Sequence, residues 1–511
     1  MRLRAVVTVV LLLCAARAYA QFDTGRIAGL VRDESSAPIP GASVTFENEG
    51  NRDQRTAVSD STGFYAVPDL PVGSYTLTVE LSGFKRFVKT AIKLSAASQL
   101  GVDVQLEVGR LEETVEVKAS AATVQTETAQ VARTVDSRQI QQLTLNGRNP
   151  VFLALLKPGV RGGLMSTFAP DSVTNGSFSI NGARDDEYVV MVDGAIATRT
   201  RSSGSMLGAQ DVETVEEVQI LTANYRAEYG RSSAGQIRFV TKSGTRDFHG
   251  DALENYRNAK LDANSWTRNR SGDPRLSSGP DPFRFHQFGF HLGGPVTIPG
   301  KFNSNRSRMF FFWGEEWIYR RDTVTSTGTV PTEAMRSGDF SELLNPANRF
   351  FGRVRTITDP RTGQPFPGNV IPPDRVSANG LALLKAFPLP TPGFQQGSAN
   401  WIGTQSSWSD LRKDTVKVDY VITPKERLTL RATHIPWHFN EPFVGSFDRA
   451  QWWWSRPNRT GAVSLNSIFS STLLNELTIS ANSDGKGEIR MLPECVSSAQ
   501  CDRSTYGLSF P

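Results

Sequence analysis

The chain has 511 residues, of which 39% are hydrophobic and 21% are charged, and its formal net charge is +5. After the first twenty residues, no stretch approaches the roughly 20 consecutive apolar residues of a transmembrane helix. The small positive charge has no clustered basic stripe and gives no support for nucleic-acid binding. Membrane residence, if any, must therefore come from strands closed into a barrel.

The first twenty residues are typical of a secretory signal peptide. Two arginines form a basic start, residues 5–16 form an apolar core, and Ala18 and Ala20 are the small residues that a signal peptidase reads. We expect cleavage after Ala20, which removes three arginines and leaves a mature charge of 5 − 3 = +2. A lipoprotein signal using Cys14 is the alternative, but Leu13 before it is not small.

Residues 24–108 predict a small all-β domain. Short alternating runs such as 25–33, 42–46 and 74–79 are separated by turns rich in glycine and proline. Short strands at close, even spacing indicate a β-sandwich of about 80 residues.

The order of motifs in this region resembles the carboxypeptidase regulatory-like domain. The matching residues are Gly29, Val31, Asp33, Pro40, Gly41, Ala42, Asp60, Gly63, Phe64, Leu70, Gly73, Ser74, Tyr75, Gly83 and Phe84. The resemblance implies a transthyretin-like fold of the carbohydrate-binding-like superfamily, without catalytic function. It leaves two roles open, a spacer and a glycan-binding module, and the spacer is favoured because no aromatic platform is visible.

A charged, β-prone segment follows at residues 109–128. Glu116 and Lys118 alternate with Val115 and Val117, as in an edge strand exposed to solvent. One interpretation is a last sandwich strand followed by a linker. The other is a strand offered to a partner's sheet, in which backbone pairing gives affinity and alternate side chains give selectivity.

The next region, residues 129–246, is predicted to be a mixed α/β unit. Its expected elements are a short helix capped by Asp136 or Ser137, a helix at 150–156, and strands at 188–192, 212–221 and 235–241.

Several linked motifs of this unit resemble the plug domain of TonB-dependent receptors. Residues 179–184 and 190–194 carry the plug signature, and later motifs up to His249 and Gly250 complete it in the right order. Glu228 and Arg231 are either contacts that hold a plug inside a polar barrel lumen or ordinary surface charges. The plug-motif residues are Asn181, Gly182, Arg184, Asp193, Gly194, Glu228, Tyr229, Gly230, Arg231, Lys242, Ser243 and Gly244.

The same resemblance implies a TonB box, the strand that pairs with the inner-membrane TonB protein, just before the plug. The segment in that position consists of Glu113, Thr114, Val115, Glu116, Val117, Lys118 and Ala119. It departs from the family's pattern by the charges of Glu116 and Lys118, which leave the register of the box open.

From Phe248 onward the sequence has the dyad alternation and aromatic strand ends of outer-membrane strands. Expected strands lie at 250–256, 285–293 and 308–317, with hairpins at 414–433 and 459–481. Residues 330 to about 410 form a long polar loop, which on a barrel belongs on the extracellular side. The loop phrases resemble the Oar-like branch of TonB-dependent transporters.

The resemblance implies a closed barrel of about 22 strands. At about 10 residues per strand plus loops, the residues after Phe248 cannot supply them. We therefore expect residues 247–511 to be the first strands of an incomplete barrel, in a protein about twice as long as this chain.

The remaining motifs do not indicate an enzyme. His434 and His438 have the spacing of a metal pair, but Pro436 lies between them and no glutamate completes a zinc-protease motif. Cys495 and Cys501 are expected to form a local disulfide in an oxidising compartment. Three tryptophans, 452–454, are either a sugar-stacking platform or, as favoured, a membrane-interface girdle.

The predicted fold is mainly β: a transthyretin-like sandwich, a mixed α/β plug, and the first strands of an antiparallel transmembrane β-barrel. The predicted function is non-enzymatic uptake at the outer membrane, without cofactor or metal. The sandwich and the TonB-box segment are expected to lie in the periplasm. The expected partners are a TonB-type energy-coupling protein, membrane lipid, and an extracellular ligand, with an oligosaccharide, peptide or protein favoured over a small siderophore. The alternative is an envelope adhesion or carbohydrate-binding protein that uses the sandwich.

Overall fold

The computed structural model describes residues 24–491, with gaps at 112, 119–130, 144, 146–147, 163–177, 185–186, 199–209, 226–228, 271–273, 386, 445–446, 448–450, 471–472 and 484–487. The predictions on the signal peptide, Ala119, Glu228, Cys495 and Cys501 fall outside these described residues.

The N-terminal part is a sandwich of two sheets around one hydrophobic core. The first sheet has the order β4 (Phe64–Leu70), β1 (Gly25–Asp33), β7 (Gln99–Gly101), and β8 (Val104–Leu106) also pairs with β1. The second has the order β3 (Gln54–Val58), β2 (Ser43–Asn48), β5 (Gly73–Glu80), β6 (Arg86–Leu94), β9 (Thr114–Lys118). Burial alternates along β1, β2 and β5, as a half-buried strand requires, which confirms the predicted sandwich. We call residues 24–118 the sandwich.

The next unit, residues 131–246, is the plug unit. Its main sheet has the order β10 (Val131–Asp136), β15 (Val215–Ala223), β16 (Gly235–Thr241), β13 (Tyr188–Val192), β14 (Ala195–Ile196). Around it lie α2 (Ser137–Gln142), the 3-10 helix Pro150–Leu156, and the pair β11 (Val160–Gly162) and β12 (Phe178–Ile180). Asp136 caps α2, as predicted, by accepting from the Gln139 N–H. Every residue of β13 and β16 is buried, so this sheet is covered on both faces.

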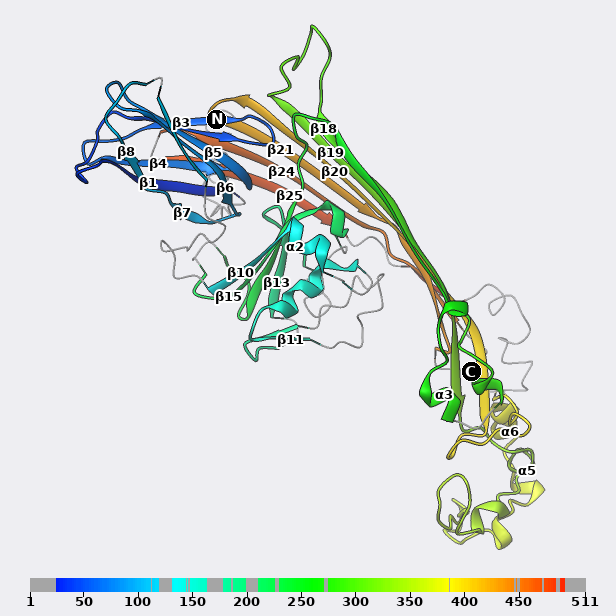
Figure 1. The fold of residues 1–511 in the computed structure, drawn as a ribbon. Coiled ribbons are helices and arrows are strands. Elements are labelled where there is room, and N and C mark those ends of the chain that lie inside the picture. The colour runs from blue at the N-terminus through cyan, green and yellow to red at the C-terminus, as the bar shows by residue number, and fades with distance from the viewer. Residues whose placement is uncertain are drawn as a thin grey trace, which may run out of the picture.

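The C-terminal part is a ten-stranded sheet, here called the barrel sheet. Its main path runs β17 (His249–Asn258), β18 (Arg284–Pro295), β19 (Met309–Gly328), β20 (Trp401–Thr423), β21 (Glu426–Ile435), β24 (Asn458–Ile468), β25 (Leu474–Ser483). Three short strands extend it beyond β20: β22 (Trp437–Pro442), β23 (Gln451–Ser455) and β26 (Glu488–Met491). The sheet is curved and open, with the plug unit on its concave side and the sandwich at one end of its strands (Figure 1).

Two strands of the barrel sheet are longer than predicted. The strand expected at 308–317 continues to Gly328, and the loop expected to reach about residue 410 ends where β20 begins at Trp401. These extensions form a polar antiparallel ribbon, from Asp322↔Ser407 to Gly328↔Trp401. Because neither face of the ribbon is apolar, the hydrophobic alternation that reveals a strand in the sequence is missing there.

The described part of the loop between β19 and β20 carries short helices, among them α5 (Glu333–Arg336) and α6 (Ala378–Lys385), at the end of the sheet opposite the sandwich (Figure 1). Among the described residues, no helix is long and apolar enough to cross a membrane.

Candidate functional site: the coupling strand and the plug anchor

Residues Thr114–Lys118 of the segment predicted as a TonB box form β9, the edge strand of the second sandwich sheet. It pairs in parallel with β6, in the register from Arg86↔Thr114 to Thr90↔Lys118. The Arg86 N–H donates to the Glu113 carbonyl at 2.8 Å, and Lys85 forms an ion pair with the Glu113 carboxylate at 3.6 Å. The sequence left open a last sandwich strand and a strand offered to a partner, and the position of β9 is compatible with both.

One edge of β9 faces β6 and the other is free within the described part of the chain, since β9 ends the sheet order. Backbone groups of successive residues point to opposite sides of a strand. Because the Glu113 carbonyl bonds to β6, the N–H groups of Val115 and Val117 also face β6. Those of Thr114 and Glu116 face the free edge. Val117 is 39% exposed and Val115 is half-buried, so pairing rather than side-chain burial holds β9 in place.

Asp193, in the plug signature, anchors the plug unit to the barrel sheet. It lies in the turn between β13 and β14 with a φ of 44°, and its carboxylate accepts from the Thr241 N–H at 2.8 Å and the Thr241 hydroxyl at 2.6 Å. Arg431 of β21 and Lys417 of β20 form ion pairs with it at 3.1 and 3.7 Å. Burial raises the pKa of Asp193, but the two cations and Thr241 together lower it by more than burial raises it. The net shift of the pKa is therefore downward.

Three more contacts join the plug unit to the same face of the barrel sheet. His291 of β18 contacts the Asp211 carboxylate, the Lys417 ammonium donates to the Thr241 carbonyl at 2.9 Å, and Arg431 donates to the Val192 carbonyl at 3.2 Å. The residues of the sheet that alternate with these point to the opposite face. There Trp313, Val416, Leu430 and Val463 are 38 to 43% exposed, as an apolar outer wall requires.

The other plug-motif residues occupy turns and close contacts. Asn181 (φ 53°) and Gly182 (φ 83°) form a turn, in which the Asn181 amide donates to the Thr222 carbonyl at 2.9 Å. A Cβ on Gly244 would lie 2.2 Å from the Phe311 carbonyl oxygen, so only glycine fits where the chain passes from plug unit to barrel sheet. Tyr229 is buried. Its hydroxyl lies 3.1 Å from the guanidinium of Arg238.

The side chains of Arg184 and Arg231 are exposed, and Lys242 is half-buried. The plug-to-barrel contact considered for Arg231 is carried in the described structure by Asp193 and Asp211. Sequence reasoning missed Lys417 and Arg431, the partners of Asp193. The signal available for them was a polar or charged residue at alternate positions of two strands, such as Lys413, Thr415 and Lys417 in β20.

Away from the sandwich, the plug-facing wall of the barrel sheet carries an aromatic cluster. Trp437 and Phe439 stack with ring centroids 4.2 Å apart, Phe439 and Trp454 with centroids 5.8 Å apart, and the Arg456 guanidinium lies 4.1 Å from the Trp454 ring centroid. Trp437 packs in a cluster with Leu411 on this wall. Trp454 stacks on Phe439 and therefore lies on this wall, so the predicted membrane girdle is wrong for Trp454. The three tryptophans cannot share one face, because neighbouring residues of a strand point to opposite faces.

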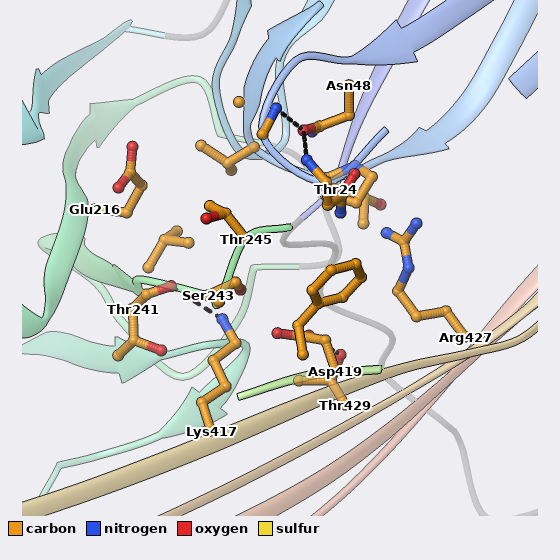
Figure 2. Close-up of a pocket in the computed structure, with 18 of the residues that line it drawn as sticks. Thr24, Asn48, Glu216, Thr241, Ser243, Thr245, Lys417, Asp419, Arg427 and Thr429 are labelled. Atoms are coloured by element: carbon orange, nitrogen blue, oxygen red, sulfur yellow. Dashed lines mark hydrogen bonds between the residues drawn. The ribbon is translucent and has the colours of Figure 1, made fainter. Parts of the chain in front are cut away.

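A cavity of about 530 Å³ lies where the sandwich, plug unit and barrel sheet meet (Figure 2). Sandwich loops around Asn48 and Pro71 line one side, Thr241 and Thr245 of the plug unit line another, and Lys417, Asp419 and Arg427 of the barrel sheet close it. Most of the residues that line it are polar or charged.

Three stretches of the chain match known protein families. Residues 26–107 match the Carboxypeptidase regulatory-like domain, residues 124–236 the TonB-dependent Receptor Plug Domain, and residues 240–490 the Outer membrane beta barrel domain. The chain belongs to the TonB-dependent outer-membrane receptors. This family consists of receptors and transporters rather than enzymes, and it places the chain in the outer membrane.

A curated relative is the TonB-dependent transporter Oar of Myxococcus xanthus, 30% identical over 325 residues, which cover 62% of this chain and 28% of the relative. The chain thus spans less than a third of that TonB-dependent transporter. Among solved structures, the outer membrane transporter YddB from Escherichia coli is 13% identical with a TM-score of 0.42, covering 69% of this chain and 38% of that one. A mutant of the ferric enterobactin receptor PfeA from Pseudomonas aeruginosa is 11% identical with a TM-score of 0.36, covering 69% and 40%.

Proposed function

We propose that this receptor takes up a large substrate across the outer membrane, using energy that a TonB-type inner-membrane protein delivers through β9. The observation that carries the proposal is the free edge of β9 in the described part of the chain. β9 belongs to the sandwich, which lies at the end of the barrel sheet opposite the long loop between β19 and β20 (Figure 1). An edge strand whose backbone N–H groups are unpaired can accept a strand from another protein, and its charged side chains keep it from aggregating.

The second step of the proposal is that pulling on β9 remodels the plug unit. The contacts that hold the plug unit in the sheet include buried charges at Asp193 and at Asp211. Such contacts can be exchanged for water contacts when the plug unit moves, because each charge regains hydration.

For the cargo, we favour an oligosaccharide, a peptide or a protein over a small siderophore. The loop between β19 and β20 spans residues 329–400, far longer than a simple connection needs. Contact with outer-membrane lipid is proposed for the apolar outer face around Trp313 and Val416.

The test is deletion of Glu113–Ala119, assayed for surface binding and for uptake on a panel of polysaccharides, proteins and a siderophore. We expect uptake of one large cargo to stop while binding of that cargo at the cell surface is retained. Unchanged uptake would refute energy coupling through β9. Binding without uptake in the parent would instead favour an adhesion function of the sandwich.

A further inference from the structure

The sandwich is docked on the barrel sheet near its short turns. Asp53, in the loop between β2 and β3, forms an ion pair with Arg427 of β21, and both side chains are about one-tenth exposed or less. Next to it, the Asn466 amide of β24 donates to the Asp69 carboxylate at 2.6 Å. Both barrel residues lie near the strand ends that Figure 1 shows beside the sandwich. The contacts therefore fix the sandwich across the rim of the sheet.

The sandwich also contacts the plug unit. The Ala96 N–H donates to the Glu217 carboxylate at 2.8 Å, and the Gln219 amide donates to the Ala96 carbonyl at 2.6 Å. Ala97 packs with Leu221 and Tyr229 of the plug unit in a small hydrophobic cluster. One domain thus bridges the two parts that must separate for a substrate to pass.

Through these two sets of contacts, the sandwich forms one wall of the cavity that Asp193 also lines. Figure 2 shows Thr241, Ser243 and Thr245 of the plug unit and Lys417 and Arg427 of the barrel sheet around that cavity, with Asn48 of the sandwich opposite. A substrate that leaves the barrel between plug unit and sheet at this point meets the sandwich next.

The docked interface contains a buried arginine whose polar atoms are poorly satisfied. The Arg55 side chain is 6% exposed, its ion pair with Asp53 is as long as 3.8 Å, and its three nitrogens have no hydrogen-bond partner in the described part of the chain. Burial lowers the pKa of Arg55, which reflects the cost of keeping this cation from water. The docked interface therefore holds, beside the Asp53 to Arg427 contact, a cation whose loss of water is poorly compensated.

We propose that the sandwich is a second gate, docked across the barrel rim and opened before the plug unit when β9 is pulled. This inference rests on the proposed function, in which a TonB-type partner pairs with β9. Because β9 stays paired with β6 when a partner strand adds to its free edge, the pull reaches the sandwich first. The plug unit then follows through the Ala96 to Glu217 contact.

The docked state is tested with a thiol in the cavity, Ser464→Cys, in membranes whose periplasmic face is reachable by an impermeant maleimide. The receptor without the added cysteine gives the background from its own thiols. We expect slow labelling in the Ser464→Cys parent and labelling at least about tenfold faster in Asp53→Arg, which places like charges beside Arg427 and Arg55.

Two variants control this experiment. Asp53→Arg combined with Arg427→Asp restores the pair with reversed charges, and we expect its labelling to return toward the parent rate. Glu34→Arg makes the same change of charge at an exposed sandwich position and leaves the rate unchanged. Equal rates in Asp53→Arg and the parent, or a double variant as fast as Asp53→Arg, would contradict the docked gate.

The pull is tested in cells that carry the partner, with a maleimide that enters the periplasm and with a cross-link between β9 and the partner measured in parallel. We expect labelling of Ser464→Cys to accelerate only in energised cells and only while the free edge is intact, so that Glu116→Pro abolishes the acceleration. A cross-link without acceleration refutes the gate and leaves the proposed function standing. If no cross-link forms, the proposed function and the pull are both refuted. The Asp53 variants still decide whether the sandwich is docked.

Discussion

Asp193 connects two parts of the chain with a single carboxylate. It is 9% exposed, fixes the turn to β16 through Thr241, and pairs with two cations on neighbouring barrel strands. Removing one partner of a buried charge cluster leaves the other charges uncompensated, which costs more than the pair contributes to stability. The plug unit therefore depends on this residue in a way that no surface charge would reproduce.

We expect Asp193→Asn to weaken the attachment of the plug unit to the barrel sheet by about 3 to 5 kcal/mol. The readout is the urea concentration at which the plug unit becomes sensitive to protease in the membrane-embedded receptor. Asp247→Asn is the matched control, because Asp247 is 89% exposed and its pair contributes less than about 1 kcal/mol. Similar resistance in both variants would show that Asp193 is no anchor.

Glu217 gives the contact between sandwich and plug unit a pH dependence. Burial raises the pKa of Glu217 to about 7, although the Ala96 N–H, a nearby serine and Arg238 lower it. The docked state therefore binds a proton more tightly than the open state, and docking is strongest below the ordinary pKa of a glutamate and weakens as the pH rises through about 7. The full effect is roughly 2 to 4 kcal/mol.

We expect Glu217→Gln to stabilise the docked receptor at pH 8 and to reduce its loss of stability between pH 5 and pH 8. The thermal unfolding midpoint of the solubilised receptor across this range is the readout. Glu116→Gln, at an exposed position, serves as the control and keeps the pH dependence of the parent. A variant at position 217 with the parent's slope would contradict the assignment.

Among the elements, β9 is the edge strand of the second sandwich sheet and the strand that the proposed function offers to a partner. Within the chain it completes the sandwich through its pairs with β6, and its other edge is free for a strand of a partner in the described structure. A parallel edge strand with little side-chain burial depends mainly on its backbone hydrogen bonds. Proline substitutions that remove an N–H group from one edge or the other therefore separate pairing with β6 from pairing with a partner strand.

We expect Val115→Pro to detach β9 from the sandwich, because the missing N–H faces β6. Hydrogen exchange at the Arg86 amide, which donates to the Glu113 carbonyl, measures this, and we expect the exchange to accelerate by about tenfold or more. Thr114→Pro removes an N–H at the free edge and leaves the Arg86 amide protected. Equal protection in both variants would show that the register of β9 differs from the one described.

The sequence predicted the elements whose signal is local. The alternation of the sandwich strands and the turn at Asp193 and Gly194 follow from short motifs, and the order of motifs carried the family. The extensions of β19 and β20 escaped prediction because they are polar on both faces. The pairing of Asp193 with Arg431 was also out of reach, since it joins residues more than 200 positions apart and depends on how the sheet curves around the plug unit.

At the scale of the whole molecule, the three parts form a series of barriers along one path. The long loop and the aromatic wall lie at one end of the sheet, the plug unit is anchored along its inner face, and the sandwich sits across the other end (Figure 1). β9, the strand proposed to pair with the partner, belongs to the last of these parts. A pull from the inner membrane would then open the barriers in order, starting from the periplasmic side.

Pairing of a TonB-type partner with the free edge of β9 is measured by the affinity of the partner's soluble periplasmic domain for the membrane-embedded receptor. Glu116→Pro removes the backbone N–H at the centre of that edge, whereas Glu116→Ala removes only the side chain. We predict that the proline variant binds at least about tenfold more weakly than the alanine variant. Equal affinities of the two variants would contradict strand pairing at β9.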